Sequence, residues 1–311
     1  MTRRRLWIAA QIAFVVALVA FLGYALQDAW ADAAPRLRDA DVVDLAIATA
    51  LLTVYYCLFV VGWQWILRTL RVRVSYAVAL QAEMASMLAK YVPGGVWTPA
   101  ARVVWLRKTG VQVATPLVVS SILLEAGLSA VSGVLVFVAG LMMIGDADAP
   151  LVPLGLFAAV VAVLLQPRVF NWIAVRVFRP FGGVVLPPLP YRVLVGLLAF
   201  YAMSWIVGGA AFLFLIRAVG GTAGAETIVF LGGTAAVGAI VAVLSVIAPS
   251  GLGVREASMY GLVLAVASSG VALGAVVLNR IAITLVEALL LLVGGVLYRR
   301  RRGQLRAAAT A

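Results

Sequence analysis

The chain contains no histidine, only one cysteine (Cys57), and few charged residues, which make up 12% of it. The absence of histidine excludes Ser-His-Asp and Cys-His nucleophile systems and every metal site with imidazole ligands. A single cysteine cannot form an internal disulfide, and we expect Cys57, in an apolar run, to pack as a small hydrophobic side chain. Polar stretches are also short, so we expect no large soluble catalytic domain.

Apolar residues fill the sequence instead, at 65% of 311 residues, with a mean hydropathy of +1.11. A soluble domain is about half apolar and about a quarter charged. Several apolar runs reach the ~20 residues that a helix needs to cross a bilayer. The composition therefore predicts an all-α polytopic membrane protein with a single membrane domain over residues 1–311.

The net charge of +12 is distributed in short basic clusters between apolar runs. This is the pattern of cytoplasmic loops facing anionic lipid, and it argues against nucleic-acid binding. Basic clusters at residues 3–5 and 299–302 predict cytoplasmic N- and C-termini, whereas aspartates at residues 28–44 indicate an external segment. We expect about six full spans, at residues 6–26, 42–67, 115–144, 151–165, 193–216 and 272–297.

Two proline-glycine breaks interrupt apolar segments. They consist of Pro93, Gly94 and Gly95 in the first half and of Pro249, Gly251 and Gly253 in the second. Non-helical backbone at membrane depth persists where it is enclosed by protein or lines a wet cavity. We predict two re-entrant broken-helix hairpins, one entering from the cytoplasm at residues 76–106 and one from outside at residues 227–267. If the hairpin arms cross the membrane, the protein has about eight or more helices.

The two breaks occur at matching places in the two halves. Pro93 and Pro249 are 156 residues apart, and Glu125 and Glu287, which lie in similar sequences, are 162 apart. Since hairpin and following span reverse direction between the halves, the pattern predicts an inverted-topology repeat, with chance similarity of apolar sequence as the alternative. The predicted parts are a first repeat at 42–145, a connecting span and cytoplasmic interfacial segment at 146–192, a second repeat at 193–298, and a basic cytoplasmic tail at 299–311.

Charged side chains inside the apolar runs are the candidate site. A charge at the membrane centre costs at least ~2.5–3.5 kcal/mol, so we expect these residues to face a shared cavity and neutralise one another. Candidate pairs are Lys90 with Glu125, and Arg280 with Glu287, which are two helical turns apart. The predicted cavity residues are Lys90, Arg102, Glu125, Arg255, Glu256, Arg280 and Glu287, while Glu83 faces either the cavity or the cytoplasmic interface.

The chemistry of this charged set suits an amphiphile. Basic side chains and the N-termini of broken helices would hold an anionic phosphate, and the acids would hold a cationic headgroup. The alternative is that the pairs only hold helices together.

Less specific signals are tryptophans such as Trp63, expected as interfacial anchors. Three glycine pairs, expected to allow close helix packing, are Gly208-Gly209, Gly232-Gly233 and Gly294-Gly295.

Several motifs occur in a characteristic order. They are Lys90-Tyr91-Val92-Pro93-Gly94-Gly95, then Arg102, Gly110, Glu125 within its span, and Pro249-x-Gly-x-Gly-x-x-Glu256. Together they resemble the lysylphosphatidylglycerol synthase transmembrane (flippase-like) family, the membrane half of the multiple peptide resistance factor proteins. The resemblance covers residues 42–297. It implies a multi-pass protein of the bacterial or archaeal cytoplasmic membrane that moves a lipid between leaflets.

Two-domain members of that family also carry a cytoplasmic aminoacyl-transferase domain. This sequence ends at Ala311, soon after its last predicted span, so we expect no synthesis of lysyl-lipid. Because no catalytic constellation, nucleotide site or metal site is recognisable in it, we also expect no enzymatic activity, no cofactor and no metal. The leading hypothesis is a flippase or scramblase for an anionic or aminoacylated phospholipid or a related lipid-linked substrate. The alternatives are a non-catalytic accessory protein for a lipid-modifying enzyme or glycosyltransferase, a transferase within the bilayer, and a transporter of a soluble solute.

Overall fold

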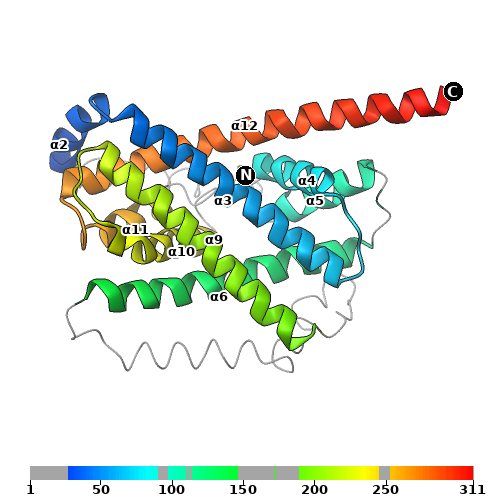
Figure 1. Cartoon of the computed structure of the whole chain (residues 1–311), viewed down its shortest axis with the longest axis horizontal. Coiled ribbons are helices and arrows are strands. Elements are labelled where there is room, and N and C mark those ends of the chain that lie inside the picture. The colour runs from blue at the N-terminus through cyan, green and yellow to red at the C-terminus, as the bar shows by residue number, and fades with distance from the viewer. Residues whose placement is uncertain are drawn as a thin grey trace, which may run out of the picture.

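A computed structural model of the protein describes residues 27–89, 97–109, 111, 114–145, 172, 189–244 and 253–310. All regular secondary structure in these residues is helical, as the sequence predicted (Figure 1). The elements are α2 (Gln27–Arg38), α3 (Val42–Thr69), α4 (Tyr76–Ala89), α5 (Trp97–Lys108), α6 (Thr115–Ile144), α9 (Tyr191–Ala218), the short 3₁₀ helix η2 (Ala225–Thr227), α10 (Ile228–Leu244), α11 (Val254–Val263) and α12 (Ser269–Thr310).

Within the described residues, five helical segments are long and apolar enough to cross a membrane. They are α3, α6, α9, Ala225–Val243 and Ser269–Arg300. Four of these correspond to predicted spans, and α6 has the bounds expected from the sequence. The predicted spans at residues 6–26 and 151–165 lie outside the described residues. The chain is therefore a multi-pass helical membrane protein.

Local sequence explains where several helices begin. The Asp41 carboxylate caps α3, accepting from the backbone N–H groups of Val43 and Asp44 at 2.8 and 2.9 Å. The acidic segment expected outside the membrane contains a helix, α2, supported by an Asp32–Arg36 pair at 3.2 Å one turn apart. The N-terminal part of the segment is thus ordered and packs against α12.

Helices α3 and α9 form the centre of the molecule and run in opposite directions (Figure 1). The Asp41 N–H, before α3, donates to the carbonyl oxygen of Ala218 at the end of α9, at 2.9 Å. Rings from both helices pack along the crossing, with Phe59 5.3 Å from Tyr201 and 5.7 Å from Trp205 between centroids. Buried aromatic area holds this pair together.

Two pairs of short helices, α4 with α5 and α10 with α11, flank this centre. Each pair packs against the long helix of the other half of the chain, because α4 contacts α12 and α10 contacts α6. The two long helices α6 and α12 also run in opposite directions in the view of Figure 1. Contacts between the halves therefore add to contacts within them, such as those of α10 with α9 and of α4 with α3, in supporting both pairs of short helices.

Glycines allow α10 to approach its neighbours closely. A Cβ atom on Gly209 or Gly232 would collide with backbone across the α9–α10 contact, and one on Gly233 would collide with Phe137 of α6. Such close approach stabilises helix pairs in a membrane. The expectation of close packing is confirmed at these three positions. On α12, a Cβ on Gly294 would lie in ordinary contact with Gln81 of α4, at 3.7 Å, and one on Gly295 would meet no atom of the described residues within 4 Å.

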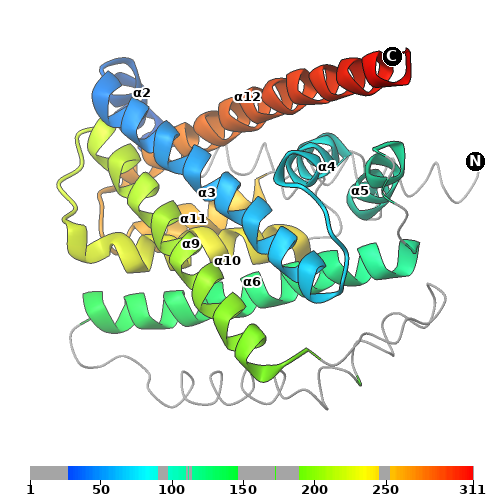
Figure 2. The same cartoon turned by 45° about the vertical axis from the view of Figure 1, so that its right-hand side comes forward.

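The two ends of the molecule differ in charge. The end of α3, the end of α5, the beginnings of α6 and α9, and the far part of α12 lie at one end (Figure 2). The basic residues there include Arg68, Arg71, Arg73, Arg107, Lys108, Arg192, Arg299 and Arg300. The opposite end, at α2 and the beginnings of α3 and α12, carries Asp28, Asp32, Asp39, Asp41 and Asp44. The basic residues expected on the cytoplasmic side thus lie together at one end, and the aspartates expected outside lie together at the other.

Candidate functional site

Arg102, on the short helix α5, is the centre of a buried charged cluster and is only 5% exposed. Its Nη1 donates to Glu125 Oε2 of α6 at 2.6 Å, and its Nη2 lies 3.3 Å from Glu83 Oε1 of α4. Its Nε donates to Ser86 Oγ of α4 at 3.3 Å. One guanidinium, with its fork of donors, therefore joins three helices.

Helix α3 completes this cluster. The Arg102 guanidinium lies over the Trp63 ring, 4.6 Å from its centroid, and the Trp63 Nε1 donates to Ser121 Oγ of α6 at 3.0 Å. Trp63 is fully buried, so the expectation of an interfacial anchor is wrong for this residue. We call Trp63, Glu83, Ser86, Arg102 and Glu125 the Arg102 cluster.

The Arg102 cluster has more acceptors than donors. With all groups ionised, its two carboxylates and one guanidinium carry a formal charge of −1. Glu83 Oε2 and Glu125 Oε1 are buried and have no hydrogen-bond partner among the described residues. Such atoms are costly unless a proton, a water or a cationic group satisfies them. The cluster can therefore accept one further positive or donating group.

A second set of charges joins α11 to α12. Arg280 Nη1 lies 3.2 Å from Glu256 Oε1, and the other carboxylate oxygen accepts from the Gly253 N–H at 2.8 Å, which caps α11. Gly253 has φ of +83°, a conformation that suits glycine. Arg280 therefore pairs with Glu256 and not with Glu287 as predicted, because the packing of α11 against α12 brings in a carboxylate that helix periodicity does not reveal.

Glu287, on α12, is buried and contacts the central helix α3. The Tyr56 hydroxyl donates to Glu287 Oε1 at 2.7 Å. Tyr56 and Trp63 are two turns apart on α3 and therefore share a face. Through this face α3 contacts both glutamates that the sequence matched between the halves, Glu287 directly and Glu125 through Arg102.

Arg255 is half-buried, and the base of its side chain lies near Gly238 of α10. No ion pair of Arg255 occurs within the described part of the chain. Its neighbour Glu256 turns toward α12 instead. Arg255 is thus a cation inside the helical region that remains available to an anionic group.

The structure brings together some predicted site residues and separates others. Arg102 and Glu125 meet, and Glu83, for which the sequence left two positions open, joins them. Glu125 takes Arg102 as its partner, whereas the predicted partner Lys90 lies outside the described residues. The hairpin residues Pro93, Gly94, Gly95, Pro249 and Gly251 also lie outside them.

Sequence reasoning missed three uncharged residues of the site: Tyr56, Trp63 as a buried contact, and Ser86. For Ser86, spacing was the available signal, because it follows Glu83 by three residues and therefore lies on the same helix face. Metal binding has no support in the described ranges, where no group of acidic or cysteine side chains could hold an ion.

A family model described as the lysylphosphatidylglycerol synthase TM region matches residues 8–294. The chain belongs to this family. In this member of the lysylphosphatidylglycerol synthase TM family, the match includes every charged residue described above, from Glu83 to Glu287. A search of curated proteins found no match to the chain.

Proposed function

We propose that this family member is a lipid translocase, of flippase or scramblase type, rather than an enzyme. It would move an anionic or aminoacylated phospholipid, or a related lipid, between the leaflets of a bacterial or archaeal cytoplasmic membrane. Both termini would face the cytoplasm, because the basic end of the molecule belongs on that side by the positive-inside rule.

The Arg102 cluster is the observation that carries this proposal. Burying a carboxylate costs several kcal/mol by order of magnitude, and a buried ion pair stabilises a fold only when further hydrogen bonds satisfy its remaining acceptors. Here Glu83 Oε2 and Glu125 Oε1 have no hydrogen-bond partner in the part of the chain that the structure describes, and they lie where the short helix pair α4–α5 meets α6. Unused acceptors beside a guanidinium suit a zwitterionic headgroup, which brings both an amine and a phosphate.

Helix length supports a re-entrant first hairpin. The described parts of helices α4 and α5 have 14 and 12 residues. At 1.5 Å per residue they are about 21 and 18 Å long, shorter than a hydrocarbon core of about 30 Å. Helix α11, with 10 residues, is shorter still, whereas its partner α10 belongs to a segment long enough to span. Short arms therefore support re-entry without crossing for the first hairpin, whereas in the second only α11 is short and the α10 arm is long enough to cross the membrane.

The exchange of contacts between halves supports an inverted repeat and suggests how the protein works. Because α4 packs on α12 and α10 packs on α6, moving either hairpin changes a contact between the halves. The headgroup would pass between the hairpins, held by Lys90, Arg102, Arg255 and Arg280, while its acyl chains stay in lipid. Alternate opening of the two hairpins would expose this path to each side.

Leaflet exchange in proteoliposomes tests the proposal. Labelled aminoacylated phosphatidylglycerol, phosphatidylglycerol and a polyprenyl-phosphate lipid would be compared, using wild type and the double variant Glu83→Gln, Glu125→Gln. The matched control is Asp32→Asn with Arg36→Gln, an exposed ion pair at the other end. We expect exchange of at least one lipid by wild type and control, and loss in the double variant. Wild type that exchanges none of the lipids would overturn the proposal and favour an accessory role.

A further inference from the structure

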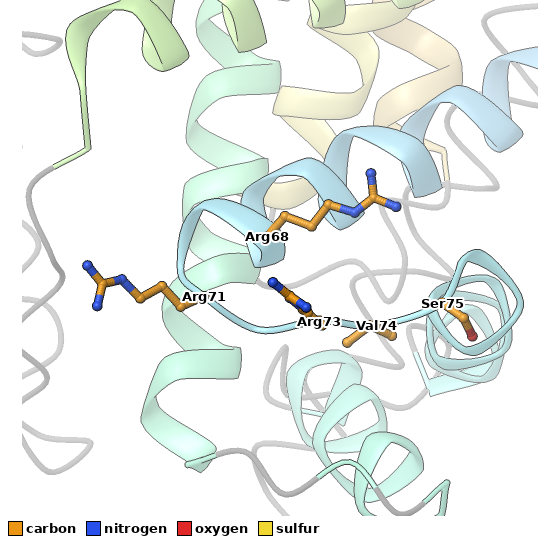
Figure 3. A pocket seen from close by; sticks show the side chains of 5 residues that line it. All are labelled: Arg68, Arg71, Arg73, Val74 and Ser75. Atoms are coloured by element: carbon orange, nitrogen blue, oxygen red, sulfur yellow. The ribbon is translucent and has the colours of Figure 1, made fainter.

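An open pocket of about 790 Å³ lies where α3 connects to α4, at the basic end of the molecule. Its lining residues are Arg68, Arg71, Arg73, Val74 and Ser75 (Figure 3). Figure 3 shows Arg73 between Arg68 and Arg71, whose side chains extend to opposite sides. The proposed lipid path at the Arg102 cluster does not use these three arginines.

The backbone of this pocket is firmly held. Leu70, Val72 and Val74 are buried, and the alternate residues Arg71 and Arg73 are exposed. The buried Gln64 side chain donates through Nε2 to the carbonyl oxygen of Val74 at 2.6 Å. The N–H of Val72 donates to the carbonyl oxygen of Leu67 at 2.8 Å, closing the end of α3. The arginines thus project from an ordered segment.

Arg71 has an unusual backbone conformation. Its φ of +63° is left-handed, and within the described residues it is the only non-glycine residue with positive φ. Helices commonly end on a left-handed residue, but glycine is the usual choice because a Cβ atom is unfavourable there. The arginine at this position therefore indicates a role for its guanidinium side chain, which glycine would not provide.

The three guanidiniums have no carboxylate partner in the described part of the chain. All three are exposed. Guanidinium groups bind phosphate through paired, charge-assisted hydrogen bonds. Because α3 is long and apolar enough to span a membrane, its last turn lies at the depth of lipid headgroups.

We propose that this pocket is a docking site for the phosphate of an anionic phospholipid in the adjoining leaflet. Arg68, Arg71 and Arg73 would contact the headgroup, and Ser75 would offer a hydroxyl donor. Such a site goes beyond lipid translocation, since it can retain or orient a lipid whether or not the protein moves lipid across the membrane.

The test measures lipid binding by the detergent-solubilised full chain, by native mass spectrometry with phosphatidylglycerol and with phosphatidylcholine. The variant Arg68→Gln, Arg71→Gln, Arg73→Gln is compared with Arg192→Gln, Arg299→Gln, Arg300→Gln, which removes equal charge from exposed positions at the same end. We expect the pocket variant to weaken phosphatidylglycerol binding by about tenfold or more, because each lost hydrogen bond to a charged group is worth at least that factor, and the control by less than about threefold. Equal losses in both variants, or no preference over phosphatidylcholine, would overturn the proposal.

Two further measurements separate the alternatives. Inorganic phosphate that displaces phosphatidylglycerol at equal concentration would assign the pocket to a free anion and overturn the lipid site. The variant Arg71→Gly removes one guanidinium and the unfavourable left-handed Cβ together. We expect it to raise the thermal unfolding midpoint of the lipid-free protein while it weakens phosphatidylglycerol binding. A variant that is destabilised, with unchanged binding, would contradict a lipid-binding role for Arg71.

Discussion

Arg102 shows how one side chain can organise the interior of a membrane protein. It contacts two carboxylates, one hydroxyl and one indole ring on three neighbouring helices. A planar guanidinium can do this because its donors point in several directions within one plane. The ammonium group of a lysine lacks this fixed arrangement of donors. The residue is therefore both the charge partner of Glu83 and Glu125 and the link between α5 and its neighbours.

Replacing Arg102 alone tests this role. The variant Arg102→Met leaves the Glu83 and Glu125 carboxylates buried without a cation, and removing one partner of a buried ion pair typically costs about 3–5 kcal/mol. We expect a clear fall in the thermal unfolding midpoint in detergent. The triple variant with methionine at positions 83, 102 and 125 should recover most of the stability, because it buries no charge. A single variant as stable as wild type would contradict this account.

At the scale of helices, small residues decide which elements can approach. Gly232 lies against the carbonyl oxygen of Trp205, and Gly233 lies against Phe137, so α10 packs closely between α9 and α6. Backbone contact of this kind replaces the hydrophobic driving force that helices lack in lipid. In the glycine pair of α12, Gly294 leaves room for a Cβ beside Gln81 and Gly295 has no described neighbour within 4 Å, so this pair is not needed for close backbone contact in the described part of the fold.

A matched pair of alanine substitutions distinguishes these roles. Gly232→Ala adds a Cβ that collides with Trp205 backbone, and overpacking typically costs about 1–3 kcal/mol. Gly295→Ala meets no atom within 4 Å and should gain up to about 1 kcal/mol from helix propensity. Thermal unfolding in detergent should therefore show a lower midpoint for the first variant only. Equal midpoints would contradict the close α9–α10 contact.

At the scale of the whole molecule, charge is separated between two ends while the interior holds paired charges. The basic end collects Arg68, Arg107 and Arg299 from helices that are distant in sequence, and the opposite end collects the aspartates near α2. This separation suits a protein that crosses a membrane with a fixed orientation, because basic loops remain preferentially in the cytoplasm.

Side-specific labelling tests the orientation and the hairpins together. In a Cys57→Ala background, Ser75→Cys and Lys108→Cys flank the α4–α5 pair, while Ala225→Cys and Ser268→Cys flank α10 and α11. All four positions are exposed. We expect a membrane-impermeant maleimide to label the first two only from the cytoplasmic side and the last two only from outside. Labelling of Ser75→Cys and Lys108→Cys from opposite sides would mean that the segment between them crosses the membrane an odd number of times, which contradicts both a re-entrant hairpin and a pair of crossing arms.

The sequence predicted the positions of helices well but predicted the ion-pair partners of buried side chains poorly. The bounds of α6 followed from apolar run length, and α4 and α5 lie where the two arms of the first hairpin were predicted, while the hairpin itself stays a prediction. The partner of Glu125 did not, because Arg102 is 23 residues away on another helix. Periodicity shows which side chains share a face of one helix, but it does not show which other helix that face meets.

By itself, the sequence determined that this protein is an all-helical membrane protein, where most described helices lie, and how charge divides between the two ends. These properties depend on hydrophobic length, helix breaks and loop charge, which are local. Only the tertiary structure decided that Arg102 joins Glu83 to Glu125, that Arg280 pairs with Glu256, and that Trp63 is buried. Those outcomes depend on how distant helices pack, and side-chain partners are chosen by proximity in space.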